Sequence, residues 1–293
     1  MPSILIIDGH AYAYRAFYAI RSLNSPTGRP TNAIYGFVKM LAKMQARLQP
    51  THLVVVWDGG LSEARQQVLP EYKAQRPEMP DALRGQLDEL LRYLAAANIA
   101  SFCRDGVEAD DYIALVVRKA RKSGLEVVVA SADKDFMQLV GPGVGLLNPN
   151  DKSETIWGAE QVLAKTGVRP EQIVDWLSLL GDAVDNIPGV PGVGTKTATE
   201  LVTRFGSVVE LYRRLEEVKS ERIRNALREA EADVRRNQSL VRLHEELACE
   251  CEIGSFAVKP ADKAGLKELF REWGFRGMLA ELEAQQPQQV DLI

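Results

Sequence analysis

Acidic residues follow three separate apolar runs of this sequence. Asp8, Asp58 and Asp133 each come directly after such a run. A single aspartate in this place is commonly a turn residue, but three of them point to a shared purpose. Because ligands of open α/β sheets bind outside the carboxyl ends of the strands, we expect these three carboxylates to meet in one cleft.

Six further acids lie in short clusters near the same predicted elements. The complete set is Asp8, Asp58, Glu108, Asp110, Asp111, Asp133, Asp135, Asp182 and Asp185. The cluster at 108–111 opens a predicted helix, where acids can also simply complement the helix dipole. If Asp182 and Asp185 lie on one helical turn, they face the same way.

So many carboxylates in one cleft require positive charge. Two like charges about 4 Å apart repel by about 4 kcal/mol at an effective dielectric near 20. Oxygen ligands select Mg²⁺, Mn²⁺ or Ca²⁺ rather than zinc. Two such ions roughly 4 Å apart form the clamp that is used for in-line attack on phosphate. The acids therefore predict metal-dependent phosphate chemistry.

The net charge of the 293-residue chain is −4, whereas nucleic-acid-binding domains are often basic. The nine acids account for this difference. Without their nine negative charges the rest of the chain carries +5, and two divalent ions bring the whole chain from −4 to 0. An acidic total is thus compatible with a DNA-binding surface around an acidic, metal-filled cleft.

Strands and helices must alternate to position these acids. Apolar β-branched runs predict strands at residues 3–7, 53–57, 98–103, 125–132 and 144–148. Apolar residues at helical spacing predict helices at 32–48, 82–97 and 109–122. This alternation predicts an α/β fold with a mainly parallel central sheet and helices on both faces.

Strand-like runs end near residue 158. Helices are predicted at 170–181, 196–205, 208–215, 221–246 and 263–273. We therefore predict an α/β domain at 1–170 and a helical domain at 171–284. The polar tail at 285–293 contains proline and is predicted to be disordered.

A glycine-rich segment directly follows the last acid pair. Its residues Gly189, Gly192 and Gly194 allow a tight hairpin with exposed backbone amides. Thr195 is a candidate N-cap of the helix that begins at Lys196, and a helix N-terminus can bind phosphate. An ordinary helix–helix turn is the alternative. The neighbouring acids favour a helix–hairpin–helix-like contact with the DNA backbone.

Other features predict a cytoplasmic protein. No apolar run approaches the roughly 20 residues of a membrane span, and the N-terminus lacks the pattern of a signal peptide. Cys103, Cys249 and Cys251 are expected to be reduced structural thiols. His10, His52 and His244 form no catalytic pattern and are expected to be structural or surface residues.

Six motifs stand in a fixed order along the chain. They are Asp8-Gly with Tyr14-Arg15-Ala-Phe17, Gly28-Arg-Pro-Thr31-Asn32-Ala-Ile-Tyr35-Gly36-Phe37, Tyr72-Lys73-Ala-Gln-Arg76-Pro, Glu108-Ala-Asp110-Asp111, Asp133-Lys-Asp135, and Gly181-Asp182 through Gly194-Thr-Lys196. Over roughly residues 3–280 the chain resembles the 5′-nuclease family. The resemblance is strongest to the 5′→3′ exonuclease portion of bacterial DNA polymerase I and its flap endonuclease relatives.

The resemblance implies a set of metal ligands. One ion would be held by Asp8, Asp58, Glu108, Asp110 and Asp111, and the second would be surrounded by Asp133, Asp135, Asp182 and Asp185. The implied ions are two Mg²⁺, for which Mn²⁺ substitutes. A K⁺ ion is implied at the backbone carbonyls of the glycine hairpin.

The resemblance also implies residues that contact the substrate. Arg15, Lys73 and Arg76 would engage the scissile phosphate and the 5′ strand, so with Asp8 they are the expected catalytic residues. The expected DNA-binding residues are Tyr72, Lys73, Arg76, Gly189, Gly192, Gly194, Thr195 and Lys196. The alternative for Lys73 and Arg76 is that they belong to a solvated charged face. Tyr72 is expected to stack on a base, and its alternative is a core or surface aromatic.

The chain departs from the family pattern in one place. Ala64, Gln66 and Gln67 replace the usual residues of a Phe-Arg-His-Glu motif, and only Arg65 is kept. Residues 61–83 should form a mobile arch over the 5′ strand, and prolines within this segment argue against a continuous helix there.

Two other functions would require a different sequence. A binding module without catalysis would lack some of the acids, and a small ribonuclease of the related single-domain type would lack the hairpin and the helical part. We predict a monomeric 5′→3′ exonuclease and 5′-flap endonuclease in replication and repair. Its substrate would be DNA with a 5′ flap, a nick or a branched end. The chain could also be the front portion of a DNA polymerase I, and its 5′ strand could be RNA instead of DNA.

Overall fold

Alternate residues of strand β1 (Ser3–Asp8) point to opposite faces of a central sheet. Ile4 and Ile6 pack into one apolar cluster, Leu5 and Ile7 pack into another, and all four are buried. This pattern suits a strand in the middle of a sheet that is covered on both faces. The continuous apolar run in the sequence therefore contributes side chains to two hydrophobic cores, one on each face of the sheet.

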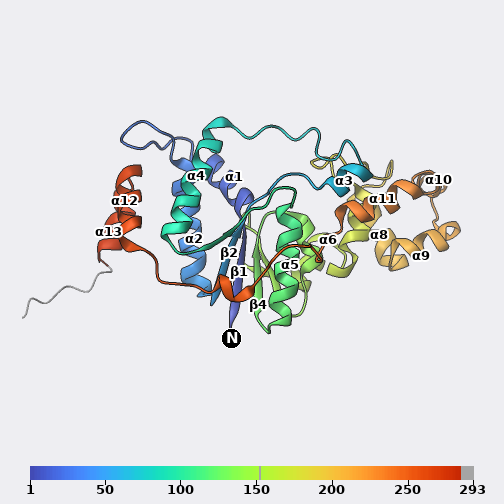
Figure 1. Ribbon diagram of the computed structural model, residues 1–293. Coiled ribbons are helices and arrows are strands. Elements are labelled where there is room, and N and C mark those ends of the chain that lie inside the picture. Colours follow the sequence, from blue (N-terminus) through green and yellow to red (C-terminus); the bar gives the residue numbers. More distant parts are fainter. Residues whose placement is uncertain (152, 285–293) are drawn as a thin grey trace, which may run out of the picture.

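The sheet has six strands, in the order β3-β2-β1-β4-β5-β6, in this computed structural model, which describes residues 1–151 and 153–284 (Figure 1). The strands after β1 are β2 (His52–Val56), β3 (Ala100–Phe102), β4 (Glu126–Ala130), β5 (Val144–Leu147) and β6 (Ile156–Trp157). Neighbours run parallel except β5 and β6. The predicted fold class and all five predicted strands are confirmed; β6, with 2 residues, is too short for periodicity to reveal.

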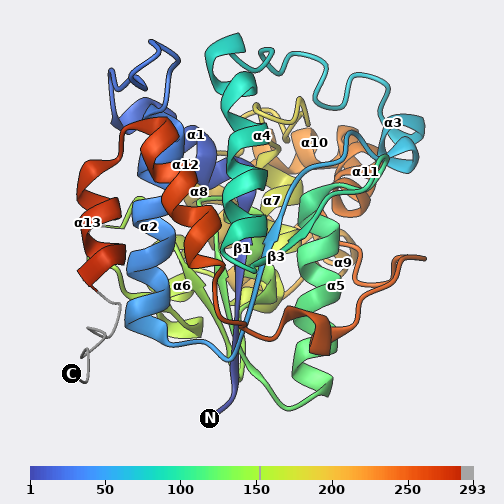
Figure 2. The same cartoon turned by 60° about the vertical axis from the view of Figure 1, so that its left-hand side comes forward.

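Helices cover both faces of the sheet, as predicted (Figures 1 and 2). They are α1 (Gly9–Ala19), α2 (Asn32–Leu48), α3 (Glu63–Val68), α4 (Asp81–Ala96) and α5 (Ala109–Lys122), followed by the 3-10 turn η1 (Lys134–Leu139). Helices α1, α2 and α4 pack with Leu5 and Ile7, whereas α5 packs with Ile4 and Ile6 on the other face. The three helices predicted here are confirmed, and α1 and α3 are additional ones.

The chain after the sheet is helical, as predicted. Its elements are α6 (Ala159–Thr166), η2 (Pro170–Gln172), α7 (Ile173–Leu180), α8 (Thr195–Phe205), α9 (Val208–Arg213), η3 (Leu215–Glu217), α10 (Glu221–Glu229), α11 (Glu231–Val241) and η4 (Ile253–Phe256). The prediction of one helix over 221–246 is wrong, because α10 and α11 are separated at Ala230 and α11 ends at Val241. The backbone turns at Ala230, with φ −91° and ψ 6°, without a glycine or proline to mark the break.

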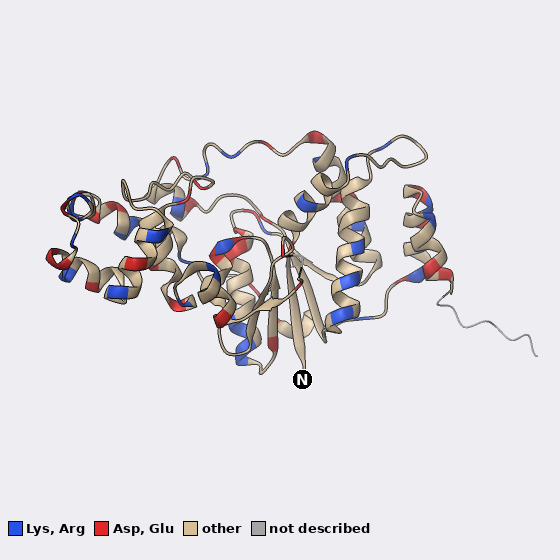
Figure 3. Ribbon diagram, turned by 180° about the vertical axis from the view of Figure 1, so that it is seen from behind, with Lys and Arg blue, Asp and Glu red and all other residues tan. Residues whose placement is uncertain are grey.

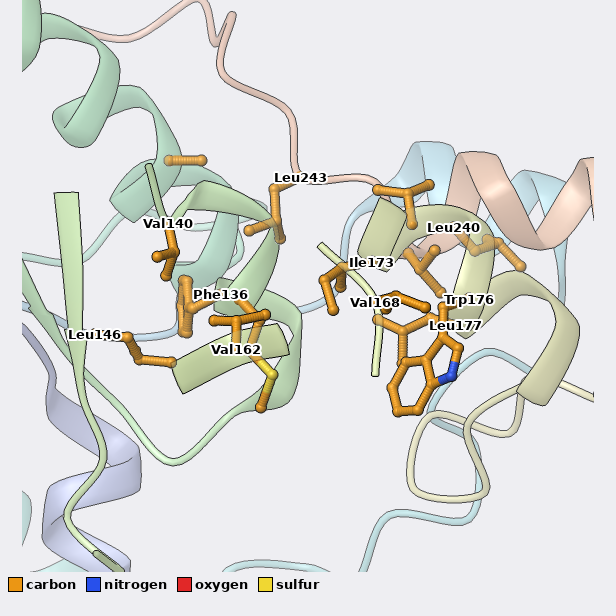
Figure 4. Packing of buried hydrophobic residues seen from close by; sticks show 14 of the residues in the cluster. Phe136, Val140, Leu146, Val162, Val168, Ile173, Trp176, Leu177, Leu240 and Leu243 are labelled. Carbon is orange, nitrogen blue, oxygen red and sulfur yellow. The ribbon is translucent and has the colours of Figure 1, made fainter. Parts of the chain in front are cut away.

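One apolar cluster joins the α5 face of the sheet to the helical part (Figure 4). Phe136, Leu146, Val162, Ile173 and Leu177 belong to it, and each is at most 1% exposed. The helical part is thereby fixed against the sheet, which determines where the residues after α7 lie. The division into two domains near residue 170 stays a prediction.

The last two helices, α12 (Lys263–Trp273) and α13 (Arg276–Ala284), return to the α/β part (Figure 2). Phe270 of α12 stacks on Tyr93 of α4, with ring centroids 6.4 Å apart. The predicted helix at 263–273 is confirmed, and the predicted disordered tail at 285–293 lies outside the described residues. None of the described helices is long and apolar enough to cross a membrane.

A side chain from α4 caps the start of α2. Gln86 is 2% exposed, and its Oε1 accepts from the backbone N of Ala33 at 2.8 Å and of Ile34 at 3.3 Å. Its Nε2 donates to Asn32 Oδ1 at 3.0 Å. Thr31, which precedes α2, makes no side-chain cap. Gln86 therefore satisfies amides that a helix N-terminus otherwise leaves free.

Replacing Gln86 is predicted to destabilise the layer formed by α1, α2 and α4. Gln86→Ala leaves two buried amides without an acceptor, so we expect urea unfolding to show a free energy of unfolding lower by about 2–4 kcal/mol. The control Gln67→Ala, at an exposed position, should change it by less than about 0.5 kcal/mol. Equal effects of the two substitutions would contradict the capping role.

Candidate active site

Six of the nine predicted acids line one cleft at the carboxyl ends of the strands. The cleft has a volume of about 840 Å³, and these acids are Asp8, Asp58, Asp110, Asp133, Asp182 and Asp185. They come from the ends of β1, β2 and β4, from the start of α5 and from the turn after α7. The acids that follow the three apolar runs thus lie together, as the position of the strands predicts.

Asp8 is the last residue of β1 and also the N-cap of α1. One of its oxygens accepts from the backbone N of Ala11 at 3.0 Å, and the other accepts from Ser131 Oγ at 2.7 Å. Because β1 lies between β2 and β4 in the sheet, Asp8 stands between the loops that carry Asp58 and Asp133. It is the central acid of the row.

Asp182 and Asp185 reach the cleft from a tight turn rather than from one helical turn. Helix α7 ends at Leu180, and Asp182 exchanges two backbone hydrogen bonds of 2.8 Å with Ile187. Lys134 lies 3.1 Å from Asp182. The turn therefore brings two acids from the helical part to the edge of the sheet.

Burial and mutual repulsion raise the pKa of several of these carboxyls. Burial raises the pKa of Asp8 to about 6, and the charges of Asp133 and Asp58 add to the shift. The same two causes, with burial first, raise the pKa of three other acids: Asp110, Asp135 and Asp185. A bound cation would favour the ionised forms of such crowded groups.

The donor set of the cleft fits hard divalent cations. Its six acids offer only oxygen atoms, and the buried Oδ1 atoms of Asp58 and Asp135 have no hydrogen-bond partner. Such ligands suit Mg²⁺ or Mn²⁺. Within the described ranges, no three His, Cys, Asp or Glu side chains are gathered tightly enough to form a ready ligand set for one ion. The acids line the cleft, but their side chains do not converge on one position.

Glu108 lies beside the cleft but is held by protein donors. Its Oε1 accepts from the backbone N of Ser62 at 3.0 Å, and its Oε2 accepts from Lys73 Nζ at 2.7 Å and Tyr72 Oη at 3.2 Å. Burial alone would raise the pKa of Glu108, but the charges of Lys73 and Arg65 hold it below its usual value. In this arrangement Glu108 fixes Lys73.

Asp111 does not line the cleft. Both of its oxygens accept from the guanidinium of Arg65, each at 2.8 Å, and Oδ1 also accepts from the backbone N of His244 at 2.9 Å. Arg65, the residue kept from the family pattern, is itself only 3% exposed. Its guanidinium faces α5 and not the substrate side of the cleft.

The three predicted phosphate-binding residues differ in position. Lys73 and Arg76 line the cleft, and Arg76 lies 3.8 Å from Asp58. Arg15 instead donates to Asn150 and lines a separate cavity beside α2. The location of Arg15 therefore differs from the one that the resemblance implies.

The segment at 61–83 contains α3 and the start of α4, and it runs above the carboxyl ends of the strands (Figure 1). Its residues 74–80 are not helical, in agreement with the prolines. Tyr72 is only 3% exposed and donates to Glu108. This burial agrees with the alternative, in which Tyr72 is a core aromatic, and stacking of Tyr72 on a base stays a prediction.

The glycine-rich segment forms a tight turn before α8. Val190 and Val193 are buried, and Val193 N donates to Val190 O at 3.0 Å. Gly192 has a φ of +79°, which glycine adopts without strain. Gly194 is the N-cap of α8, so the prediction that Thr195 caps this helix is wrong by one residue.

The predicted DNA-binding glycines have different surroundings. A Cβ at Gly189 would lie 2.0 Å from the carbonyl O of Leu180, so this glycine is required by internal packing. At Gly194 nothing lies within 4 Å of such a Cβ. Thr195 and Lys196 are exposed next to it. The open side of the turn is therefore at Gly194 and the start of α8.

Sequence reasoning missed several residues of the cleft. His10 lines it, and the backbone N of Asp58 donates to His10 Nδ1 at 3.1 Å. Burial lowers the pKa of His10. Tyr14 and Tyr18 also line the cleft and are stacked, with ring centroids 6.3 Å apart. The only sequence signal for His10 is its place two residues after Asp8.

Two family models match the chain. The model described as 5′-3′ exonuclease, N-terminal resolvase-like domain, matches residues 3–167. The model described as 5′-3′ exonuclease, C-terminal SAM fold, matches residues 168–264. The chain belongs to the 5′-3′ exonuclease family. It is accordingly a nuclease, and the resemblance drawn from the six motifs is confirmed.

Curated relatives agree with this family. The 5′-3′ exonuclease of Aquifex aeolicus (strain VF5) is 36% identical over 283 residues, which are 97% of this chain and 96% of that protein. DNA polymerase I of Bacillus caldotenax is 36% identical over 96% of this chain, but over only 32% of the polymerase. The chain thus spans nearly the whole length of one relative and about a third of the other.

Solved structures share the fold of this 5′-3′ exonuclease. The zinc-bound 5′-exonuclease of T5 has a TM-score of 0.68 at 26% identity, covering 82% of this chain and 89% of that one. The catalytic core of Rad2 in complex with DNA substrate has a TM-score of 0.66 at 16% identity, covering 96% and 91%. At the lower identity the likeness concerns the fold alone.

The raised pKa of Asp8 predicts that its charge destabilises the metal-free 5′-3′ exonuclease. Because the pKa rises from 3.8 to about 6 on folding, stability from this group is present at low pH and is lost as the pH rises through 6. Asp8→Asn keeps an N-cap acceptor. In EDTA at about pH 8 its melting temperature should equal the wild-type value or exceed it by about 2–4 °C.

With Mg²⁺ the same substitution should lower nuclease turnover by orders of magnitude. The control Asp88→Asn, at an exposed position of α4, should leave both the melting temperature and the turnover unchanged. Near-wild-type turnover of Asp8→Asn would show that Asp8 is not part of the active site.

Proposed function

We propose that the chain is a structure-selective 5′-nuclease that acts on DNA as a 5′→3′ exonuclease and a 5′-flap endonuclease, in replication and repair. The observation that carries this proposal is the row of strand-end acids in a cleft beneath the segment at 61–83. We keep the proposed division into a nuclease domain at 1–170 and a helical DNA-binding domain at 171–284. A cytoplasmic location and a monomeric state are part of the same proposal.

Two divalent ions are proposed for the cleft, Mg²⁺ or its substitute Mn²⁺. Their ligands would come from the acids that are open to the cleft: Asp8, Asp58, Asp110, Asp133, Asp182 and Asp185, with Asp135 behind them. Bound ions of this kind offset negative charge on a phosphate and act as Lewis acids. The zinc-bound T5 5′-exonuclease supports a divalent metal in this family.

The chain's own cations position the scissile phosphate. Arg76 stands at the rim of the cleft, 3.8 Å from Asp58 and 3.9 Å from Asp185, with 47% of its side chain exposed, so its guanidinium can reach two oxygens of a phosphate. Lys73 lies deeper, where Glu108 holds its ammonium at 2.7 Å. We infer that Arg76 captures the phosphate and that Lys73 supplies positive charge next to it.

The duplex is proposed to rest on the open side of the glycine turn. Gly194, Thr195 and Lys196 are exposed at the start of α8, where Lys196 supplies a cation, and a helix N-terminus binds phosphate without reading bases. A K⁺ ion at the carbonyls of this turn is part of the proposal. Lys and Arg residues are spread over the helical part among Asp and Glu residues (Figure 3), and they would extend the contact with the DNA backbone.

Selectivity would then come from the shape of the substrate. The duplex lies on the turn, and the 5′ strand passes beneath the segment at 61–83 to the cleft. A 5′ flap, a nick or a branched end fits this path. The same chemistry would serve a chain that continues into a DNA polymerase I.

A panel of labelled DNAs tests the proposed function. In Mg²⁺ we expect cuts near the junction of a 5′ flap and short 5′→3′ products from nicked duplex, each with a 5′-phosphate. Blunt duplex and single strands should react more slowly, and the base sequence should matter little. EDTA should abolish all cleavage. Undiminished cleavage in EDTA, or a preference for plain 3′ ends, would contradict the proposal.

The turn makes a separate prediction about duplex binding. Gly194→Ala fits the free protein, because nothing lies within 4 Å of the new methyl group. It should weaken binding of flap DNA, measured in Ca²⁺ at several salt concentrations, by about tenfold, because the methyl group separates the backbone amides from the phosphates. The control Gly254→Ala also has open space and should bind normally. Equal affinities of the two variants for flap DNA would show that the turn is not part of the DNA-binding surface.

A further inference from the structure

Asp111 belongs to the acidic stretch that opens α5, yet both of its oxygens are bonded within the protein. Arg65 Nη2 donates to Oδ1 and Arg65 Nη1 donates to Oδ2, each at 2.8 Å. The backbone N of His244 also donates to Oδ1. Only 4% of the Arg65 side chain and 5% of the Asp111 side chain are exposed. The pair is therefore a bidentate, charge-assisted bond that water does not weaken.

Asp110, the preceding residue, has different surroundings. It lines the cleft together with Asp8 and Asp133, whereas Asp111 does not. Successive residues of an α-helix point about 100° apart. Two adjacent carboxylates at the start of α5 consequently face two different parts of the molecule.

Arg65 links three segments that are far apart in the sequence. From α3, its Nε donates to Leu240 O at 3.0 Å and its Nη2 donates to Arg242 O at 3.2 Å. These carbonyls lie at the C-terminal end of α11, where carbonyls lack helical partners and a cation is favourable. Its Nη1 also lies 3.3 Å from Glu108 Oε1. Every side of the guanidinium is thus in use.

We propose that Asp111 is not a metal ligand, and that Arg65 and Asp111 are positioning residues that brace α3 against the start of α5. The inference rests on the proposed function, because the brace acts through Asp110 and Lys73. Ser62, the N-cap of α3, donates its backbone N–H to Glu108 at 3.0 Å, and Glu108 accepts from Lys73 at 2.7 Å. The brace therefore sets the distance between the Lys73 ammonium and the acids of the cleft.

The assignment differs from the one that the resemblance implies, in which Asp111 shares a metal with Asp110. To ligate an ion, Asp111 would have to leave Arg65, and a buried guanidinium would lose its counter-charge. Breaking one partner of a buried pair is strongly unfavourable. The geometry favours a permanent pair.

Matched substitutions of the two neighbouring acids test the proposal. Calorimetric titration of the full chain with Mn²⁺ should show that Asp110→Asn weakens binding by about tenfold or more, or loses one ion. Asp111→Asn should bind Mn²⁺ within about threefold of wild type, yet cleave flap DNA with a lower kcat at an unchanged half-saturating Mn²⁺ concentration. Loss of Mn²⁺ affinity in Asp111→Asn equal to that in Asp110→Asn would overturn the proposal.

A second arm examines the brace without metal. In EDTA, proteinase K should cut the segment at 61–83 faster in Arg65→Met and in Asp111→Asn than in wild type. The double variant Arg65→Met/Asp111→Leu, which removes both charges, should be cut no faster than either single variant. If the increases in cleavage rate of the two single variants multiplied in the double variant, Arg65 and Asp111 would have independent roles, which would contradict the brace.

The double variant also serves if a single variant fails to fold, because an apolar replacement of a buried pair is tolerated. It lacks Asp111 altogether, so wild-type Mn²⁺ binding by it supports the proposal and lost binding refutes it. If the wild-type chain itself bound no Mn²⁺, the proposed metal-dependent function would fail, while the proteolysis cycle would still decide whether the brace exists.

Discussion

Repulsion among carboxylates at one end of the sheet is the constraint on which the rest of this structure depends. Adjacent strands lie about 4.8 Å apart, and β2, β1 and β4 are adjacent, so Asp8, Asp58 and Asp133 are held close by the backbone itself. The chain meets this constraint by sorting its acids. Buried cations of the protein offset the negative charges of Glu108 and Asp111. The acids that are open to the cleft would instead be offset by bound metal ions.

The segment at 61–83, which carries Lys73, is hydrogen-bonded to the turn after α7. Lys73 N donates to Asp185 O at 3.0 Å, and Asn186 Nδ2 donates to Glu71 O at 2.9 Å. Lys73 and Asn186 have φ values of 56° and 58°, a left-handed conformation that is costly for residues other than glycine. The surrounding bonds, above all the pair of Lys73 with Glu108, keep the backbone in this state.

The sequence allowed the positions of the acids to be predicted better than their directions. Asp8 and Asp58 follow apolar runs that can be recognised in the sequence, so their place at the strand ends is determined by the neighbouring residues. The direction of Asp111 is decided by Arg65, 46 residues away, and that of Arg15 by Asn150, 135 residues away. Such partners leave no periodic signal. The break between α10 and α11 at Ala230 likewise has no sequence signal, because neither glycine nor proline stands there.

The turn at 182–187 connects the acidic cleft to the glycine turn. It carries two acids of the cleft, and its backbone continues within a few residues into the glycine turn that is proposed to hold the duplex. The apolar cluster of Figure 4 fixes α7, from which both turns extend, against the sheet. In the proposed complex, one short stretch of chain sets the distance from the duplex to the acidic cleft. In that complex the cut would be measured from the end of the duplex, without contact with the bases.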